Sequence, residues 1–431
     1  MTPAARIAAA IDLLEAIDAS PRPADAMANE FFRARRFIGS GDRRAVSDRA
    51  WGILRSRRRL TWWLDRAGAA STPRLLVAAS LLLESWSLDG VAQSFSGGQF
   101  APAPLLAPER AALRTLESRT LEHPDMPPSV RLEVPDWIFP LLEARFGDAV
   151  EAELAALGTP APLDLRVNLL KTTREQALAA LAAEGIDAVP TRYSPWGLRM
   201  PGRRALTTGP AFQAGLVEIQ DEGSQLVAVL VGAAPGMRVA DWCAGAGGKT
   251  LAVAATMGNR GHIVACDVHD KRLAACVQRL RRAGVHNVER HLIEAGDKWT
   301  KRRAGSFDRV LVDVPCTGCG TWRRNPDART RLTETDLAEL VIKQANILDT
   351  ASRLVKIGGR LIYATCSLLP AENEDQIEGF VQRHPDFSLV PLGEAWPLPG
   401  APPCDGPFLS LTPRRHDTDG FFGAVLARAA A

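Results

Sequence analysis

Two cysteines and two charged residues stand at positions where this chain could do covalent chemistry. Cys316 follows one apolar, strand-like segment, Cys366 ends another, and Asp313 precedes Cys316 by three residues. Lys249 closes a glycine-rich loop further upstream. A thiolate is a strong nucleophile, whereas carboxyl and ammonium groups hold or move protons. These four residues are therefore the candidate catalytic set.

Paired thiols beside a methyl donor suit alkylation of a pyrimidine ring. Carbon 5 of cytosine is too electron-poor to accept a methyl group directly from a sulfonium, but it becomes nucleophilic once a thiolate has added to carbon 6. An acid near N3 stabilises that adduct, and a base then removes the carbon-5 proton so that the thiol can leave. Uracil needs the same addition, so the thiols alone leave the identity of the base open.

The donor is indicated by the segment DWCAGAGGKT (241–250), which follows a strand-like segment and opens a helix. A phosphate-binding P-loop needs glycine where Cys243 stands, and a dinucleotide fingerprint needs glycine where Thr250 stands, so both motifs fail. Asp267 ends the next strand-like segment, 20 residues after Gly247, where a carboxylate can accept from both ribose hydroxyls. S-adenosylmethionine (AdoMet), a nucleoside without phosphates, meets these requirements. The alternative is that the segment is a turn that only packs a helix on a strand and binds no ligand.

The remaining cysteines are expected to play simpler parts. Cys319 makes a C-x-x-C pair with Cys316, but structural zinc needs four ligands, and the sequence has no second C-x-x-C or paired histidine motif. We therefore expect no metal. An odd total of seven cysteines in a large chain favours reduced thiols. Four of them are expected to be packing residues: Cys243, Cys266, Cys276 and Cys404.

Length and composition favour a folded, multi-domain protein. The 431 residues are 46% hydrophobic and 23% charged, which suits two to four domains and excludes a disordered or fibrous chain. The longest apolar run, from Leu75 to Leu83, is too short to span a bilayer. Asp12, Glu15 and Asp18 interrupt the stretch that a signal peptide would need to be apolar. We expect a cytoplasmic monomer without a membrane partner.

Positive charge is unevenly distributed although the net charge is only +3. Between Phe31 and Arg66 arginines far outnumber the aspartates Asp42, Asp48 and Asp65. Such a cluster can neutralise phosphates of a nucleic acid; a solvated helix face in an arginine-rich chain is the alternative. The cluster consists of Arg33, Arg35, Arg36, Arg43, Arg44, Arg49, Arg55, Arg57, Arg58, Arg59 and Arg66.

Hydrophobic periodicity divides the chain into three predicted domains, 1–123, 124–215 and 216–431. Apolar residues at three- and four-residue spacing predict an all-helical first domain, and a Pro-rich linker follows at 124–140. Strand-like 163–171, helical 172–186 and strand-like 193–200 predict a small α+β domain. From residue 217 onward, helical and strand-like segments alternate, which predicts a parallel sheet covered on both faces. Ligands of such sheets gather at the carboxyl ends of the strands, where each motif described above lies.

In order and spacing, these motifs resemble those of the RsmB/Sun family of RNA cytosine-5 methyltransferases. The resemblance is close in the carboxyl-terminal half and looser over the amino-terminal helices, which look like a NusB-like RNA-binding domain. It implies an α/β fold: a Rossmann-like AdoMet-dependent methyltransferase domain preceded by an all-helical NusB-like domain and a small α+β subdomain. The matching segments are 241–250, Asp267, Asp297 in AGDKW, DVPCTGCGTWRRNPD (313–327), YATCSLLPAENE (363–374) and HDTDGFF (416–422).

The resemblance also implies roles for single residues. Cys366 would be the nucleophile, Cys316 would assist release of the methylated base, and Asp313 and Lys249 would contact the target base. Thr317 stands where serine is common, and the glycine loop reads Ala-Gly-Ala where Ala-Ala-Pro is usual; both departures keep small side chains. AdoMet would be bound by Cys243, Ala244, Gly245, Ala246, Gly247, Gly248 and Lys249, with Asp267 at the ribose, Asp297 near the adenine and Asp313 in part.

The implied activity is formation of 5-methylcytidine in RNA, with small-subunit ribosomal RNA as the favoured substrate and transfer RNA as the alternative. Two other classes of function are alternatives to this activity. A non-catalytic RNA-binding or assembly factor is disfavoured because both thiols, Asp313 and Lys249 are retained. If the chain were a nicotinamide-dependent oxidoreductase, it would bind NAD in place of AdoMet.

Overall fold

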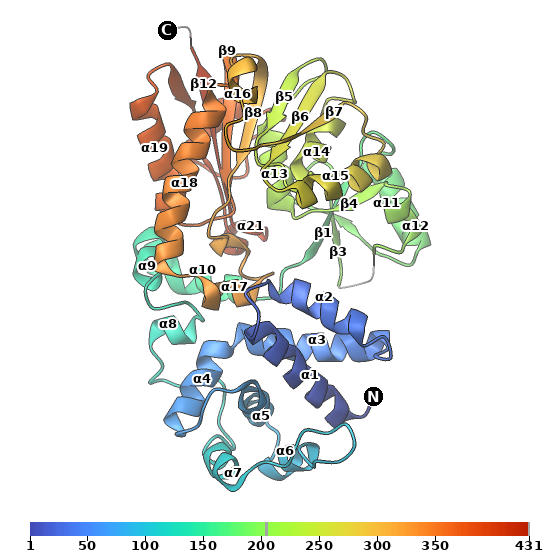
Figure 1. Cartoon of the computed structure of the whole chain (residues 1–431), viewed down its shortest axis with the longest axis vertical. Helices are drawn as coiled ribbons and strands as arrows, with labels where there is room; N and C mark the ends of the chain where they lie inside the picture. Colours follow the sequence, from blue (N-terminus) through green and yellow to red (C-terminus); the bar gives the residue numbers. More distant parts are fainter. Residues whose placement is uncertain (203–205, 430–431) are drawn as a thin grey trace. The chain divides into compact units, whose positions relative to one another are not determined.

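The computed structural model of the chain describes residues 1–202 and 206–429 and divides into two compact units (Figure 1). The first, called here the helical unit, contains Met1–Gly158 and Trp322–Leu332. The second, called here the sheet unit, contains Thr159–Thr321 and Thr333–Ala431. Residues 203–205 and 430–431, which fall in the predicted 124–215 and 216–431 domains, lie outside the described residues.

The described part of the helical unit contains helices and no strands, as the periodicity predicted. Helix α1 begins at Pro3 because the Thr2 side chain accepts from the backbone N–H of Ala5 at 3.1 Å. Its apolar face is buried, with Leu14 and Ile17 each 1% exposed. None of the described helices combines the length and apolar composition that crossing a bilayer requires. The helices are α1 (Pro3–Asp18), α2 (Ala24–Ala34), α3 (Ser40–Arg55), α4 (Arg57–Arg66), α5 (Pro73–Leu83), α6 (Leu88–Ser94), α7 (Ala107–Arg114), α8 (Pro128–Arg131), α9 (Phe139–Phe146), η1 (Gly147–Ala149), α10 (Val150–Gly158) and α17 (Pro326–Arg331).

Two tryptophans of α4 belong to the core of this unit. Trp63 is 5% exposed, and its indole Nε1 donates to the carbonyl oxygen of Leu121 at 3.1 Å. Trp62 is half-buried and meets Trp63 edge to face, with the ring centroids 5.2 Å apart. The pair therefore packs helices together. The predicted linker at 124–140 is itself partly helical, because it contains α8 and the start of α9.

A late segment of the sequence, Trp322–Leu332, packs within the helical unit. The Asp327 carboxylate accepts from the backbone N–H of Ala24 at 3.0 Å, and Arg331 donates to the carbonyl oxygen of Ser20 at 2.8 Å. The sequence pattern had grouped this segment with residues 216–431, because periodicity reports the type of an element and not the core against which it packs. The three-part division of the sequence stays a prediction.

The sheet unit starts with a small antiparallel sheet of strand order β2-β3-β1-β4. Helix α11 follows β1 and is capped reciprocally by Thr173 and Gln176. The strand, helix and strand predicted between residues 163 and 200 are confirmed. The elements are β1 (Leu163–Val167), α11 (Arg174–Ala183), β2 (Val189–Pro190), β3 (Gly197–Met200), α12 (Pro210–Gln213) and β4 (Val217–Ile219).

The large sheet has the order β10-β12-β9-β8-β5-β6-β7, with β11 paired to β12. The run from β9 to β7 is parallel, as predicted, but β12 pairs antiparallel with both β9 and β10. The predicted parallel sheet is thus one part of a mixed sheet. The strands are β5 (Arg238–Asp241), β6 (His262–Asp267), β7 (Val288–Leu292), β8 (Phe307–Asp313), β9 (Val355–Thr365), β10 (Phe387–Val390), β11 (Leu409–Leu411) and β12 (Phe421–Arg428).

Helices cover both faces of this sheet because successive strand residues alternate between two cores. Val239 packs in the core that helices α13, α14 and α15 complete, whereas its neighbour Ala240 packs in the core completed by α16, α18 and α19. The helices predicted from the alternation are confirmed as α13 (Glu222–Leu230), α14 (Gly248–Thr256), α15 (Asp270–Ala283), α18 (Glu334–Ser352) and α19 (Glu374–Arg383). The shorter helices, which the sequence pattern did not predict, are α16 (Trp299–Arg302), η2 (Cys319–Thr321), η3 (Pro370–Glu372), α20 (Leu392–Ala395) and α21 (Pro413–His416).

Candidate active site

A cavity of about 920 Å³ opens at the carboxyl ends of β5, β6, β8 and β9 in the sheet unit. The chain leaves β5 toward β6 on one side and returns to β8 on the other, and ligands of open sheets bind at such a reversal of strand order. The volume falls in the usual range for small-molecule sites, roughly 300–1,000 Å³. Predicted residues on its wall are Cys243, Ala244, Gly245, Lys249, Asp267, Asp313, Cys316 and Cys366.

The glycine loop between β5 and α14 forms one wall through its first residues. Gly247 has a φ of +80°, and a Cβ there would lie 2.3 Å from the Sγ atom of Cys276, so conformation and space both require glycine. The carbonyl oxygen of Ala246 accepts from Arg279 at 2.9 Å, and that of Gly248 accepts from Arg166 at 2.8 Å. Ala246, Gly247 and Gly248 are not among the described cavity-lining residues, so their observed part is to shape the turn.

Asp267 ties this loop to the end of β6. Its Oδ2 atom accepts from the N–H of Gly245 at 2.8 Å, and its Oδ1 atom accepts from the N–H of His269 at 2.8 Å. The residue is 5% exposed and lines the cavity. A carboxylate oxygen has two lone pairs, so each oxygen can still accept from a ribose hydroxyl.

Asp297 is engaged elsewhere. Its Oδ1 atom accepts from the N–H of Trp299 at 2.7 Å, and its Oδ2 atom lies 2.6 Å from Nε2 of His291. The backbone bond from Trp299, with a further contribution from His291, lowers the pKa of Asp297. Asp297 is not among the described residues that line the cavity. In the structure it fixes the start of α16, and its predicted contact with adenine stays a prediction.

Cys316 and Cys366 lie side by side at the cavity wall. Their Sγ atoms are 3.4 Å apart, and both residues are half-buried. The hydrogen bond with Cys366 and then burial raise the pKa of Cys316 well above its ordinary value, and the nearby Glu372 raises it further. Cys316 is therefore a neutral thiol at neutral pH, in contact with a second sulfur. This arrangement can present two sulfur atoms to one ring.

Lys249 and Asp313 form an ion pair beside the thiols. Nζ of Lys249 lies 2.6 Å from Oδ2 of Asp313, and the two side chains are 11% and 28% exposed. Burial opposes the positive charge of Lys249, but Asp313 outweighs it, so the pKa of Lys249 is raised. The Lys249 ammonium also lies 5.5 Å from the ring centroid of Phe421. A fixed ammonium and carboxylate thus face the same cavity as the two sulfurs.

Cys319 serves to join the two thiol-bearing loops. Its Sγ atom accepts from the N–H of Leu368 at 3.0 Å and lies 3.4 Å from Oγ of Ser367. Burial raises the pKa of Cys319 to about 11, so it is not a nucleophile at neutral pH. No cluster of three His, Cys, Asp or Glu side chains suited to a metal occurs within residues 1–202 and 206–429.

Sequence reasoning missed several residues of the cavity wall. Val268 and Ile342 line it although they are 57% and 66% exposed, and Phe421 and Ile293 line it as well. Exposed apolar side chains in a cavity are suited to an aromatic ring. One signal was available: α18 contributes Glu339, Ile342, Lys343, Asn346, Ile347 and Thr350, whose spacing marks one face of a helix.

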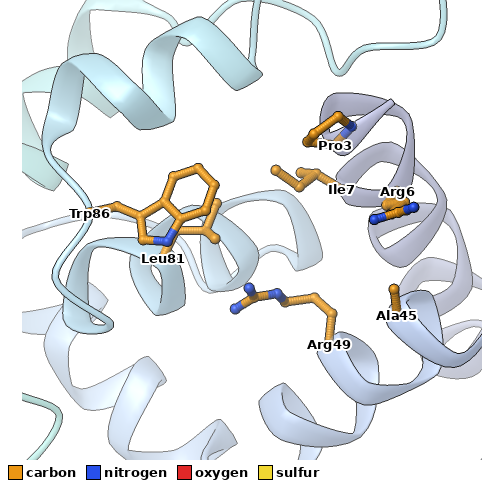
Figure 2. Close-up of a pocket in the computed structure, with 7 residues that line it drawn as sticks. All are labelled: Pro3, Arg6, Ile7, Ala45, Arg49, Leu81 and Trp86. Carbon is orange, nitrogen blue, oxygen red and sulfur yellow. The ribbon is translucent and has the colours of Figure 1, made fainter. Parts of the chain in front are cut away.

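The arginine cluster of the helical unit is largely paired. Arg49 bonds to Glu84 at 2.6 Å, and similar ion pairs join Arg57, Arg58, Arg59 and Arg66 to acidic residues of the same unit. Figure 2 shows Arg49 and Trp86 at a hollow of about 150 Å³ in this unit. This volume is well below that of typical ligand sites. Among the exposed arginines of the cluster are Arg33 at the end of α2 and Arg36 in the turn before α3, and the adjacent Phe37 is 77% exposed.

The sheet, the glycine loop and the strand-end carboxylate define an α/β protein of the Rossmann-like methyltransferase class. The model of the 16S rRNA methyltransferase RsmB/F family matches residues 228–427, and the ferredoxin-like domain model of the same proteins matches residues 134–207. The chain belongs to the RsmB/F methyltransferase family. This membership confirms the predicted family and the predicted cofactor, AdoMet.

Three similar proteins document the likeness. The probable ribosomal RNA small subunit methyltransferase B of Synechocystis is 39% identical over 300 residues, which cover 68% of this chain and 67% of that protein. The ribosomal RNA small subunit methyltransferase B of Pectobacterium atrosepticum is 34% identical over 296 residues, 68% of this chain and 66% of that protein. The crystal structure of PH0851 covers 99% of both chains with a TM-score of 0.82 and 26% identity.

Proposed function

We propose that this protein transfers a methyl group from AdoMet to carbon 5 of cytidine in small-subunit ribosomal RNA, in the cytoplasm. One observation carries the proposal: two thiols 3.4 Å apart stand on the wall of the cavity that Gly245 and Asp267 also line. A donor of adenosine type and a covalent nucleophile can therefore meet on one pyrimidine ring, the nucleophile at carbon 6 and the donor at carbon 5. The names of the Synechocystis and Pectobacterium relatives support the choice of RNA.

The proposed mechanism begins with Cys366. Its thiolate adds to carbon 6 of the ring, and carbon 5 becomes nucleophilic as charge moves toward N3. When bound, AdoMet supplies an electrophilic methyl group. The carbon-5 proton must then pass to a base, a role that water in the open cavity can fill, before the bond between sulfur and carbon 6 breaks and its electrons return to Cys366. The neutral thiol of Cys316, already in contact with the Cys366 sulfur, would donate a hydrogen bond to that sulfur as it leaves.

Asp313 and Lys249 would hold the edge of the base. The Asp313 carboxylate can accept from the amino group of cytosine, whereas uracil presents a carbonyl oxygen there that a carboxylate repels. The Lys249 ammonium, 2.6 Å from Asp313, would balance negative charge that develops at N3. This preference supports cytosine over uracil, a choice that the thiols alone leave open.

RNA would contact the helical unit at the turn between α2 and α3. Arg33 in the last turn of α2 and Arg36 in the turn itself are exposed, and Arg35, which lies 4.0 Å from Asp12, packs on the ring of Phe31 at 3.8 Å. The exposed Phe37 is a suitable platform for stacking an unpaired base. We infer that this turn, and not the ion-paired part of the arginine cluster, contacts phosphates.

The test is a methyl-transfer assay with AdoMet labelled in its methyl group. Unmodified small-subunit ribosomal RNA and unmodified transfer RNA serve as parallel substrates, and nucleosides are analysed by mass spectrometry after digestion. We expect labelled 5-methylcytidine from the ribosomal RNA. Label in transfer RNA alone would overturn the substrate, label on uridine would overturn the base, and no label in either RNA would overturn the activity.

A further inference from the structure

Glu372, a fully buried carboxylate, has no part in the mechanism above although it lies next to the two thiols. It is 0% exposed and lies in η3, seven residues after the end of β9. Its Oε1 atom accepts from the N–H of Thr317 at 2.8 Å and from Nε2 of Gln344 at 2.9 Å. Its Oε2 atom accepts from the hydroxyls of Thr317 and Ser367. Both oxygens are thus fully engaged.

These partners are the immediate neighbours of the reactive cysteines. Thr317 directly follows Cys316, and Ser367 directly follows Cys366. Gln344 of α18 donates from the same nitrogen to the carbonyl oxygen of Pro315, the residue before Cys316. One carboxylate therefore connects two loops that are about fifty residues apart in the sequence and that arise from different strands.

Glu372 is itself held in place from β9. The hydroxyl of Tyr363 donates to the carbonyl oxygen of Glu372 at 2.7 Å. Asn373 accepts from the Thr365 hydroxyl at 2.6 Å and donates to the carbonyl oxygen of Ser367 at 3.0 Å. Burial of a charged group is costly unless every lone pair finds a donor. A buried, fully satisfied network of this kind specifies one loop arrangement, because any displacement leaves the carboxylate without partners.

The four donors to Glu372 are neutral, so its negative charge is felt by the nearby sulfurs. It contributes to the raised pKa of Cys316, after the hydrogen bond with Cys366 and burial, and it contributes after burial to the raised pKa of Cys319. Glu372 thus acts on the thiols in two ways: through its hydrogen bonds to the residues beside them, and directly through its charge.

We propose that Glu372 is the positioning residue that fixes the two thiol-bearing loops against each other. The inference rests on the proposed function, in which Cys316 acts as a neutral thiol beside the nucleophile. Glu372 touches neither the donor nor the base; it acts through Thr317, Ser367 and Gln344. Serine at position 317 would keep the hydroxyl that the carboxylate binds.

The first test compares Glu372→Gln with Asp375→Asn, which removes an exposed carboxylate three residues away. In Glu372→Gln the amide N–H groups oppose the donors of Thr317 and Ser367, and the charge is lost. We expect kcat for methyl transfer to fall at least about 10-fold, with KM for AdoMet changed less than about 2-fold. In Asp375→Asn both constants should stay at the wild-type values.

The second readout needs no RNA. Iodoacetamide alkylates thiolates, and peptide mass spectrometry reports the pH at which Cys316 becomes reactive. We expect this pH to fall in Glu372→Gln, because the carboxylate no longer disfavours the Cys316 thiolate. A wild-type alkylation profile together with wild-type kcat would overturn the inference. If the wild-type protein methylates no RNA but the alkylation profile still shifts, the proposed function fails and the positioning role stands.

A second pair of variants covers the case in which Glu372→Gln does not fold. Thr317→Val removes only the hydroxyl that donates to Glu372, whereas Thr317→Ser keeps it. We expect kcat to fall about 3- to 10-fold in Thr317→Val and to remain within 2-fold in Thr317→Ser. Equal activity of the two variants would overturn the role of this network.

Discussion

The two sides of the candidate active-site cavity are built in different ways. The donor side, residues 241–250 with Asp267, is a turn between adjacent elements, closed by one carboxylate that accepts from backbone N–H groups. The thiol side, residues 315–320 and 366–373, is held by side chains from distant parts of the chain that meet at Glu372. The donor side is thus specified mainly by backbone contacts of the turn, with Arg166 and Arg279 bonded to two of its carbonyl oxygens. The thiol side is specified only by side chains that the completed fold brings together.

Lys249 joins the two sides, and its loss should have the largest effect. Lys249→Met leaves the Asp313 carboxylate partly buried without its partner and removes positive charge from the cavity. We expect the single-turnover rate at saturating AdoMet to fall about 100- to 1,000-fold. Lys356→Met, which breaks the Lys356–Asp308 pair at the opposite end of the sheet, is the control and should stay near the wild-type rate. A comparable loss in both variants would show a general effect on the fold.

Asp267→Ala should damage the donor side alone. It removes the acceptor of the N–H groups of Gly245 and His269 and the proposed acceptor of the ribose hydroxyls. We expect the Kd of AdoMet, measured by calorimetry, to rise roughly 100-fold, since charged hydrogen bonds contribute about 1.5–3 kcal/mol each. The rate at saturating AdoMet should change less than about 3-fold. Asp297→Ala removes a carboxylate that bonds outside the cavity and should raise the Kd of AdoMet less. An equal rise in both variants would contradict a separate role for Asp267 in binding the donor.

Asp241 gives the donor side a pH dependence near neutrality. Burial raises the pKa of Asp241 from 3.8 to about 7. Its contribution to stability is therefore fully present below pH 4 and is lost as the pH rises through 7. The wild type loses this contribution as the pH rises, whereas Asp241→Asn cannot ionise and does not. We therefore expect the Tm of Asp241→Asn minus the Tm of the wild type to increase by roughly 5 °C between pH 5 and 8.

Asp308→Asn is the matched control for that experiment. Bonds from the Arg238 N–H and from Lys356 outweigh burial and lower the pKa of Asp308. Its contribution is therefore present above its ordinary pKa and is lost only on acidification. The Tm of Asp308→Asn relative to wild type should stay constant from pH 5 to 8. A constant difference for Asp241→Asn as well would contradict a titration of Asp241 in this range.

The same contrast explains what could be predicted from the sequence. The glycine loop and Asp267 lie in contiguous segments with strong periodicity, so their position at the strand ends followed from the alternation of elements. The two reactive cysteines could be named for the same reason. Glu372 could not be assigned a role, because its partners are 5 to 55 residues away and no local pattern encodes a side-chain network.

Long-range packing also accounts for the other differences. Strand β12 is antiparallel and is preceded only by the short helix α21, so the alternation of strands with long helices that predicted a parallel sheet did not extend to it. Trp322–Leu332 packs with the amino-terminal helices because Asp327 and Arg331 bond to backbone groups about 300 residues away. Periodicity identifies such segments as helix or strand but carries no information about their partners.

Trapping of the covalent intermediate tests most directly whether the two sulfurs act on one pyrimidine. Cys316→Ala, Cys366→Ala and the double variant are incubated with unmodified ribosomal RNA and AdoMet and separated on denaturing gels. With the release step impaired, Cys316→Ala should accumulate a protein–RNA adduct, and both variants that lack Cys366 should form none. An adduct in the double variant, or its absence from a Cys316→Ala protein that still binds AdoMet and RNA, would contradict the assignment.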